Sequence, residues 1–205
     1  CGHFKADDGT TQEIKNNRII ISMTLLAGAV SLFVGNAYQA QMPEFSSNLG
    51  ASEATFNYSA LLTSSAAGAL AAGILLEIRS FMLPQARTAF VQVLVWCCLI
   101  FGFAMTDNLY VALIFLFIAG FLELSFKSMS QTLVQLRAPE KIRGRVIGLF
   151  TSSSLGLKTF SGITVGFGGS YIGIHASLGY SAAALFLITI LLFIFLTLEK
   201  NGNQT

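Results

Sequence analysis

The sequence predicts an all-α membrane protein, built as a bundle of six transmembrane helices. Of the 205 residues, 54% are hydrophobic and only 11% are charged, whereas average soluble domains carry about 25% charged residues. A membrane-spanning helix needs roughly 20 mainly apolar residues, and six stretches of the chain reach that length. The net charge of +2 gives no indication of a nucleic-acid partner.

The six predicted spans are joined by short polar connections. They cover 19–42, 54–78, 88–106, 109–136, 146–173 and 177–198. Residues 1–18 are polar and mixed in charge, unlike a signal peptide, so we expect a cytoplasmic linker there. The transmembrane domain then covers 19–198 and a cytoplasmic tail covers 199–205. The chain begins with Cys1 and not with Met, and we expect it to be a fragment.

The basic residues predict the orientation of these spans. With the N-terminus placed inside, ten of the 12 lysines and arginines fall in inner segments and none falls in an outer loop. The ten are Lys5, Lys15, Arg18, Arg79, Arg87, Arg137, Lys141, Arg143, Arg145 and Lys200. This distribution follows the positive-inside rule. Both termini are therefore predicted to be cytoplasmic, while Lys127 and Lys158 lie within spans.

The spans contain no motif of a catalytic or metal-binding site. Cys97 and Cys98 are neighbours in an apolar run and lack the spacing of a metal or redox site. There is no HExxH, no GxSxG and no paired-carboxylate metal motif. His175 stands alone near a predicted outer loop. We therefore expect no cofactor, no metal and no enzymatic activity.

Polar residues divide the spans into two groups. The third and sixth are apolar around nearly their whole circumference, as lipid-facing helices are, so the other four are expected to form the interior. In the second span, Ser65, Ala69 and Gly73 have the small-xxx-small spacing of a packing seam. The outer end of the first span either lines an extracellular mouth or lies at the membrane interface, and its polar residues are Asn36, Tyr38, Gln39 and Gln41.

The fifth span carries two stripes at helical spacing. The polar stripe consists of Thr151, Ser154, Lys158 and Ser161. The glycine stripe, which predicts close helix packing, consists of Gly162, Gly166, Gly169 and Gly173. The serines either face water or only pack, whereas Lys158, near mid-span, is expected to line a cavity.

The fourth span places an acid and a base four residues apart, Glu123 and Lys127, on a face shared with Gly120 and Ser130. Each charge at bilayer depth costs about 2.5–3.5 kcal/mol. An isolated ion pair with a purely structural role would therefore be strongly unfavourable. Two arrangements stay open. Either Glu123 is the local counter-ion of a snorkelling Lys127, or it reaches across to Lys158 and belongs to a cavity.

The loop after the fourth span resembles a conserved feature of a transporter family. The stretch QTLVQLRAPEKIRGRVIGLF is similar to the junction between the tenth and eleventh helices of the major facilitator superfamily. It is closest to the branch of enterobactin exporters and macrolide efflux proteins, whose pattern is matched by Gln135, Pro139, Arg143, Gly144 and Arg145. The stretch from Met42 to Gly73 resembles the seventh-to-eighth-helix region of the same family.

The resemblance implies that this chain is the C-terminal half of a twelve-helix transporter. Its partner would be an N-terminal six-helix half or a parallel second copy, in a bacterial cytoplasmic (inner) membrane. The function implied is proton-coupled export, by alternating access, of a small amphipathic or anionic compound such as a drug or siderophore. The loop with Pro139 would act as a cytoplasmic gate. The alternative is a truncated membrane protein that does not transport and has a partner-binding or regulatory role.

The expected substrate and proton pathway combines charged and polar residues from three spans. Its members are Glu123, Lys127, Lys158, Ser154, Ser161, Asn36 and Gln39. Glu123 is the candidate for proton coupling, because an apolar setting raises the pKa of a carboxyl group and a nearby lysine lowers it. Lys158 is the candidate for binding an anionic group of the substrate.

Overall fold

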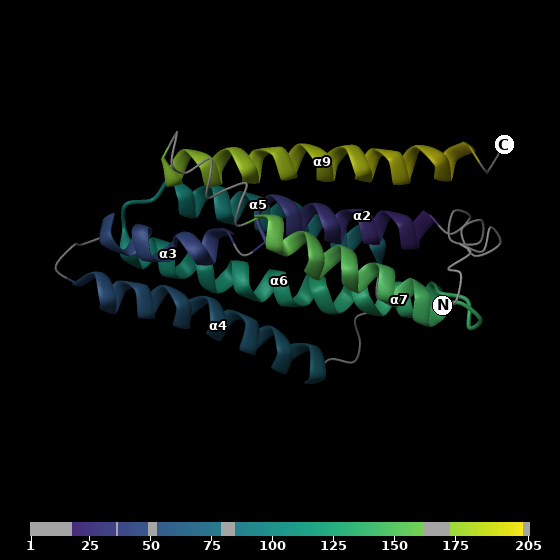
Figure 1. Ribbon diagram of the computed structural model, residues 1–205, viewed down its shortest axis with the longest axis horizontal. Helices are drawn as coiled ribbons and strands as arrows, with labels where there is room; N and C mark the ends of the chain where they lie inside the picture. Colours follow the sequence, from purple (N-terminus) through teal and green to yellow (C-terminus); the bar gives the residue numbers. More distant parts are fainter. Residues whose placement is uncertain (1–17, 36, 49–52, 79–84, 162–172, 203–205) are drawn as a thin grey trace, which may run out of the picture.

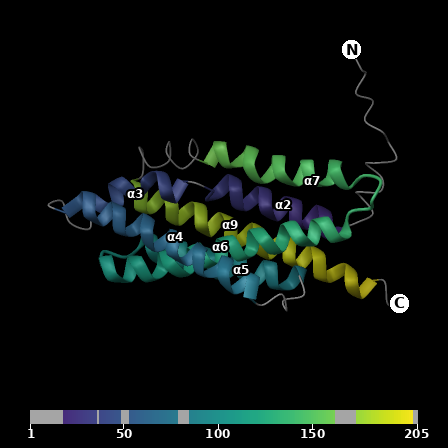
Figure 2. The ribbon, with the colours of Figure 1, turned by 90° about the horizontal axis from the view of Figure 1, so that it is seen from below.

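All regular structure in the described part of the chain is helical. The computed structural model describes residues 18–35, 37–48, 53–78, 85–161 and 173–202. The elements are α2 (Arg18–Phe33), α3 (Ala37–Asn48), α4 (Ala54–Ile78), α5 (Ala86–Ala104), α6 (Leu109–Arg137), α7 (Arg143–Thr151), the π-helical η2 (Ser152–Gly156) and α9 (Ile174–Gly202). Residues 157–161 are also helical. The helices run side by side along the long axis of the molecule (Figures 1 and 2).

Four helices in the described part of the chain are long and apolar enough to cross a membrane: α4, α5, α6 and residues 176–194 of α9. They confirm helices in the second, third, fourth and sixth predicted spans. Residues 162–172 of the fifth span lie outside the described residues, as do 1–17 of the expected linker and 203–205 of the expected tail. The total of six spans therefore stays a prediction.

The first predicted span is not one helix, because the helix is interrupted at Gly35. This residue has a φ of 37°, in the left-handed region that favours glycine. Its amide donates to the Val30 carbonyl at 2.9 Å, which closes α2. A Cβ at Gly35 would run into the Ser31 carbonyl oxygen and the Ser161 hydroxyl. Conformation and contact both require glycine at this break, and α3 begins at Ala37.

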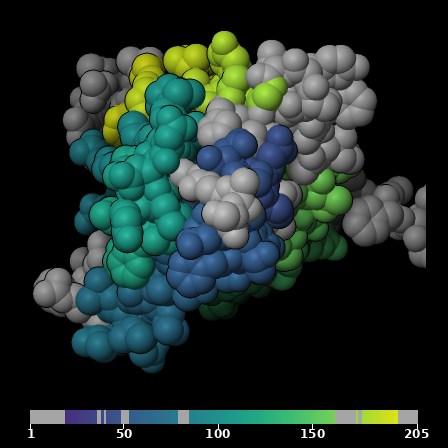
Figure 3. Space-filling view, turned by 90° about the vertical axis from the view of Figure 1, so that its left-hand side faces the viewer, coloured from purple at the N-terminus to yellow at the C-terminus, as the bar shows by residue number. Residues whose placement is uncertain are grey.

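Helix α6 is the centre of the bundle. It packs against α4 and α5 and also contacts α2 and α7, while α9 packs on α5 and α2. Viewed from the end at which α3 lies, the space-filling surface of Figure 3 shows α9 at the top and α4 at the bottom, with α3 between them. This arrangement places the middle of α6 among four other helices.

The seam between α4 and α6 depends on two glycines. A Cβ on Gly68 would run into the backbone of Phe117, and one on Gly120 into the backbone of Ser65. Ser64 Oγ also donates to the Leu113 carbonyl across this seam, at 2.6 Å. Ser65 thus lies in the seam as predicted. Gly73 also faces α6, but an added Cβ would make only an ordinary contact of 3.7 Å with Leu124, so a close backbone approach does not require glycine there.

Within the described structure α5 is covered more than α4, and the expected division into lipid-facing and interior helices stays a prediction. In the 18-residue apolar stretch of each helix, 39% of the residues are buried in α5 but only 22% in α4. The reason is position: α5 lies between α6 and α9, whereas α4 packs on α3 and α6 alone. Helix α4 exposes several large apolar side chains, which are Phe56, Leu70, Ile74, Leu75 and Ile78.

Charge differs between the two ends of the bundle. The end of α4, the start of α5, the end of α6 and the start of α7 lie together at one end (right in Figure 1). That end holds the exposed cations Arg87, Arg137, Lys141, Arg143 and Arg145, along with Glu77 and Glu140. The loops and helix ends opposite hold Glu44, Glu53 and Asp107, all exposed. One end of the bundle is therefore mainly basic and the other acidic.

Candidate functional site

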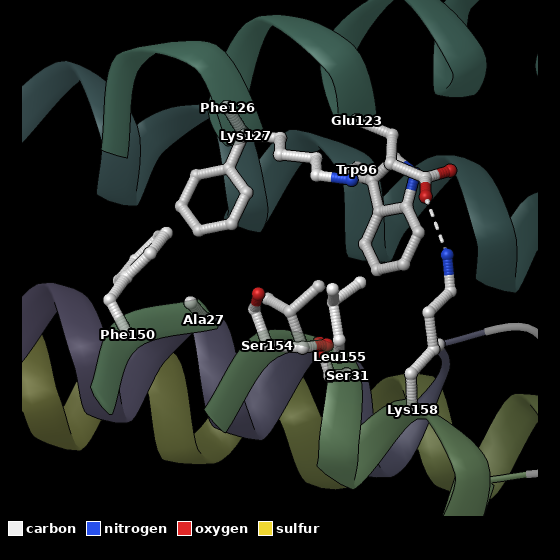
Figure 4. A pocket seen from close by; sticks show the side chains of 12 residues that line it. Ala27, Ser31, Trp96, Glu123, Phe126, Lys127, Phe150, Ser154, Leu155 and Lys158 are labelled. Carbon is white, nitrogen blue, oxygen red and sulfur yellow. Dashed lines mark hydrogen bonds and ion pairs between the residues drawn. The ribbon is translucent and has the colours of Figure 1, made fainter. Parts of the chain in front are cut away.

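Glu123 is at the midpoint of α6, 14 residues from Leu109 and 14 from Arg137. At a rise of 1.5 Å per residue, this is about 21 Å from either end of the helix. Its Oε1 lies 3.7 Å from Lys158 Nζ, and both side chains are little more than a quarter exposed. Figure 4 shows this ion pair crossing from α6 to the helix that follows η2. Of the two arrangements left open by the sequence, the structure has the one that reaches Lys158.

Tyr38 is the second partner of the Glu123 carboxylate. Its hydroxyl donates to Glu123 Oε2 at 2.8 Å and accepts a hydrogen bond from Gln39 Nε2 at 3.2 Å. The Tyr38 ring is fully buried and packs edge-on against Trp96, with ring centroids 6.4 Å apart. The break at Gly35 places Tyr38 at the start of α3, at the depth of Glu123. One carboxylate thereby links α3, α6 and the segment 157–161.

Lys127 lies one turn from Glu123 and is exposed. Across the residues that the structure describes, its ammonium group forms no ion pair. Figure 4 shows the side chain extending toward Trp96 and Glu123, back toward the middle of α6 and away from the basic end of the bundle. The structure therefore does not show the predicted snorkelling of Lys127 with Glu123 as its counter-ion.

The polar stripe predicted for the fifth span is interrupted by η2. A π-helical turn holds more residues than an α-helical one and shifts the side chains that follow it. Ser161 is fully buried and Thr151 is exposed, whereas Ser154 and Lys158 lie between these extremes. On a regular helix these four side chains would share one face. In this structure they do not.

Serines of η2 and α2 join these two elements through their backbones. Ser31 Oγ donates to the Ser154 carbonyl at 2.6 Å, and Ser153 Oγ donates to the Thr24 carbonyl at 3.2 Å. Ser161 Oγ donates to the Lys158 carbonyl at 2.8 Å. In the described structure these serines thus hold the helices together and position Lys158.

Two pockets meet at Glu123 and Lys127. A small cavity of about 50 Å³ lies between α2, α5, α6 and the segment after α7, and Trp96, Ser154 and Lys158 also line it. A larger pocket of about 370 Å³ lies between α3, α4 and α6, and Gln39, Ser65 and Ala69 are among its lining residues. Glu123 and Lys127 of α6 therefore lie between a small cavity and a roomier one, both with a mainly apolar lining.

The predicted gate loop is remote from this site, at the basic end of the bundle. Helix α6 ends at Arg137 and Pro139 follows, as expected for a residue that disfavours helix before it. Arg143, Gly144 and Arg145 form the first turn of α7 and are exposed, as is Gln135. At Gly144 an added Cβ would meet no described atom within 4 Å.

The remaining predicted residues are Asn36 and the glycine stripe. Asn36, Gly162, Gly166 and Gly169 lie outside the described residues. Gly173 precedes α9 with a φ of 84°, and an added Cβ there would meet no described atom within 4 Å. Tyr38 and Trp96 join the site without having been predicted, because a tyrosine near a helix end and a tryptophan in an apolar run are ordinary.

No group of three or more potential metal ligands occurs among the residues the structure describes. Cys97 is buried and Cys98 is exposed, and both are free thiols. The chemistry available at the site is therefore that of a carboxylate, two ammonium groups, a phenol and an indole. Such groups can exchange a proton and bind an anion.

Comparison with known protein families gives one match. Residues 14–204 match the model of the family MFS_3, described as transmembrane secretion effector. The match covers nearly the whole chain, including every helix described above. No curated protein matches the sequence.

Proposed function

The chain belongs to the MFS_3 family of transmembrane secretion effectors within the major facilitator superfamily, and on that basis we propose a proton-coupled exporter. It is a membrane transport protein with apolar transmembrane helices. The exported compound is proposed to be small and amphipathic or anionic. Transport would proceed by alternating access, in which the substrate site opens to one side of the membrane at a time.

The observation that carries this proposal is the Glu123–Lys158 ion pair at mid-helix. A carboxylate in apolar surroundings gains a proton more readily, and a facing ammonium opposes that gain. A substrate anion bound beside this ion pair would compete with Glu123 for Lys158, and a proton could then replace the ammonium group on the carboxylate. Proton binding and substrate binding would thereby be coupled at one side chain.

The surface of this chain is consistent with a further membrane partner. Helix α4 has little cover within the described structure, and the larger pocket opens beside it. In the superfamily two six-helix halves are related by an axis along the membrane normal. We propose that an N-terminal six-helix half, or a parallel second copy, completes the substrate path on this side.

The charge asymmetry of the bundle supports an orientation. The positive-inside rule places its basic end in the cytoplasm, and both termini are proposed to be there as well. The membrane is proposed to be a bacterial inner membrane. Arg143 and Arg145, exposed at the start of α7, would then act at the cytoplasmic gate by binding carbonyl or acidic groups of a neighbouring helix end.

Glu123→Gln is expected to uncouple transport from the proton gradient. The amide keeps the shape and a hydrogen-bond acceptor for Tyr38, but it cannot take up a proton. In proteoliposomes, transport driven by a pH gradient should fall by at least about tenfold, a change of about 1.4 kcal/mol, while exchange without a gradient persists. The panel of probes is carboxyfluorescein, ethidium and dihydroxybenzoate.

Glu53→Gln is the matched control for this experiment. Glu53 is exposed at the acidic end of the bundle, so its loss should leave gradient-driven transport unchanged. Retention of full proton coupling by Glu123→Gln would remove Glu123 from the mechanism.

A further inference from the structure

The indole N–H of Trp96 is buried without a hydrogen-bond partner. The residue is 3% exposed, and within the described chain no acceptor meets its Nε1 atom. A buried donor that stays unpaired is costly, because it has given up its hydrogen bonds to water. Trp96 lines the small cavity together with Glu123, Lys127 and Lys158. Trp96 is therefore part of the wall of a cavity that also holds three charged side chains.

The charges of this cavity do not balance. Lys127 and Lys158 supply two positive charges, and Glu123 supplies one negative charge that is shared with Lys158 and Tyr38. Lys127 is left without a carboxylate among the described residues, and Figure 4 shows it extending toward Trp96. It is ten residues from the end of α6, about 15 Å along the helix. Among the described residues, one positive charge at this depth has no acidic partner.

We propose that Trp96 Nε1 and Lys127 Nζ bind a single carboxylate group of the transported compound. This inference rests on the proposed function and specifies its substrate class. One carboxylate oxygen would accept from the indole and the other from the ammonium group, so that both open donors are satisfied. A monoanion also neutralises the one surplus charge, whereas a phosphate monoester, with nearly two charges at neutral pH, would leave a surplus negative charge.

The two pockets fit the two parts of such a compound. The small cavity, about 50 Å³, has room for a group of few atoms. The adjoining pocket of about 370 Å³ has a mainly apolar lining, including Leu62, Ala66 and Ala69. A compound with a carboxylate at one end and an apolar body therefore matches the site better than a small dianion or a cation.

The fluorescence of Trp96 provides a direct test, since this is the single tryptophan of the chain. The chain in lipid nanodiscs would be titrated at neutral pH with hexanoate, and with hexanamide as the neutral control. Hexanoate should change the Trp96 emission saturably, and hexanamide should not. Lys127→Gln should weaken hexanoate binding by about tenfold, the loss expected for one hydrogen bond to a charged group.

Three further variants keep the test decisive. Lys127→Arg retains the charge and should retain most of the affinity, which separates charge from misfolding. Arg87→Gln removes a charge from the exposed basic end, outside the gate loop, and should leave hexanoate binding unchanged. For Trp96→Phe, which removes only the donor, ligand-observed NMR should show a similar loss of about tenfold in hexanoate affinity.

The subsite is overturned if hexanoate gives no saturable change, if hexanamide acts equally, or if Lys127→Gln or Trp96→Phe binds with unchanged affinity. Binding of this kind needs no gradient. If hexanoate binds as described but no probe is transported, the proposed function fails and the subsite stands. If transport is coupled through Glu123 but hexanoate does not bind, the subsite fails and the function stands.

Discussion

Lys158→Glu is expected to abolish transport. The substitution would place a second carboxylate where an ammonium group now lies 3.7 Å from Glu123. Two like charges would then face each other in the middle of the bundle, where each unpaired charge costs about 2.5–3.5 kcal/mol. One of the two carboxyl groups would be held protonated, which removes the exchange between proton and substrate. Flux in proteoliposomes should fall below about a tenth of the wild-type value.

A charge swap tests whether the pair itself is what matters. Glu123→Lys combined with Lys158→Glu restores opposite charges across the same gap, so the double variant should be better folded than either single reversal. Size-exclusion chromatography in detergent measures this directly. Arg87→Glu, at the exposed basic end and outside the gate loop, is the matched control and should behave as wild type. Wild-type flux in Lys158→Glu would show that the ion pair has no part in transport.

Gly120→Val is expected to have the largest effect on stability. At this point α4 and α6 touch through their backbones, and even a Cβ would run into Ser65. Within a membrane, helices associate through close packing and not through a hydrophobic force, so a forced separation removes much of the contact. We expect a loss of at least about 2 kcal/mol, measured as a shift of the unfolding midpoint in detergent.

Gly148→Val is the control for the glycine substitution. Gly148 is an exposed residue of α7, and an added Cβ would meet no described atom within 4 Å. The substitution changes the same residue type without a collision and should leave the midpoint close to wild type. An unchanged midpoint in Gly120→Val would mean that α4 and α6 do not pack as described.

The sequence predicted the long helices well, because their signal is local. An uninterrupted apolar run of about 20 residues is sufficient to expect a membrane helix, and α4, α5 and α6 follow such runs closely. The break between α2 and α3 was not predicted. Glycine is common inside membrane helices, and only the contact of Gly35 with Ser161 and its positive φ show why the chain breaks there.

The site was predicted in part. Depth in the membrane singled out Glu123, Lys127 and Lys158, but spacing alone could not decide which lysine pairs with the acid. The answer depends on η2, whose wider turn sets the direction of Lys158 and has no signature in the sequence. Tyr38 could not be placed either, since its approach to Glu123 depends on the break at Gly35. That the indole N–H of Trp96 has no acceptor among the described residues can be recognised only once the neighbours of Trp96 are known.

The central claim is that a protein containing this site moves a compound at the expense of a proton gradient. The most direct measurement is transport by the unmodified protein in proteoliposomes, recorded together with the internal pH. We predict accumulation of an anionic probe only while a pH gradient exists, with protons moving in the opposite direction, and loss of both when a protonophore collapses the gradient. Accumulation that is indifferent to the protonophore, or proton movement without probe, would contradict the claim.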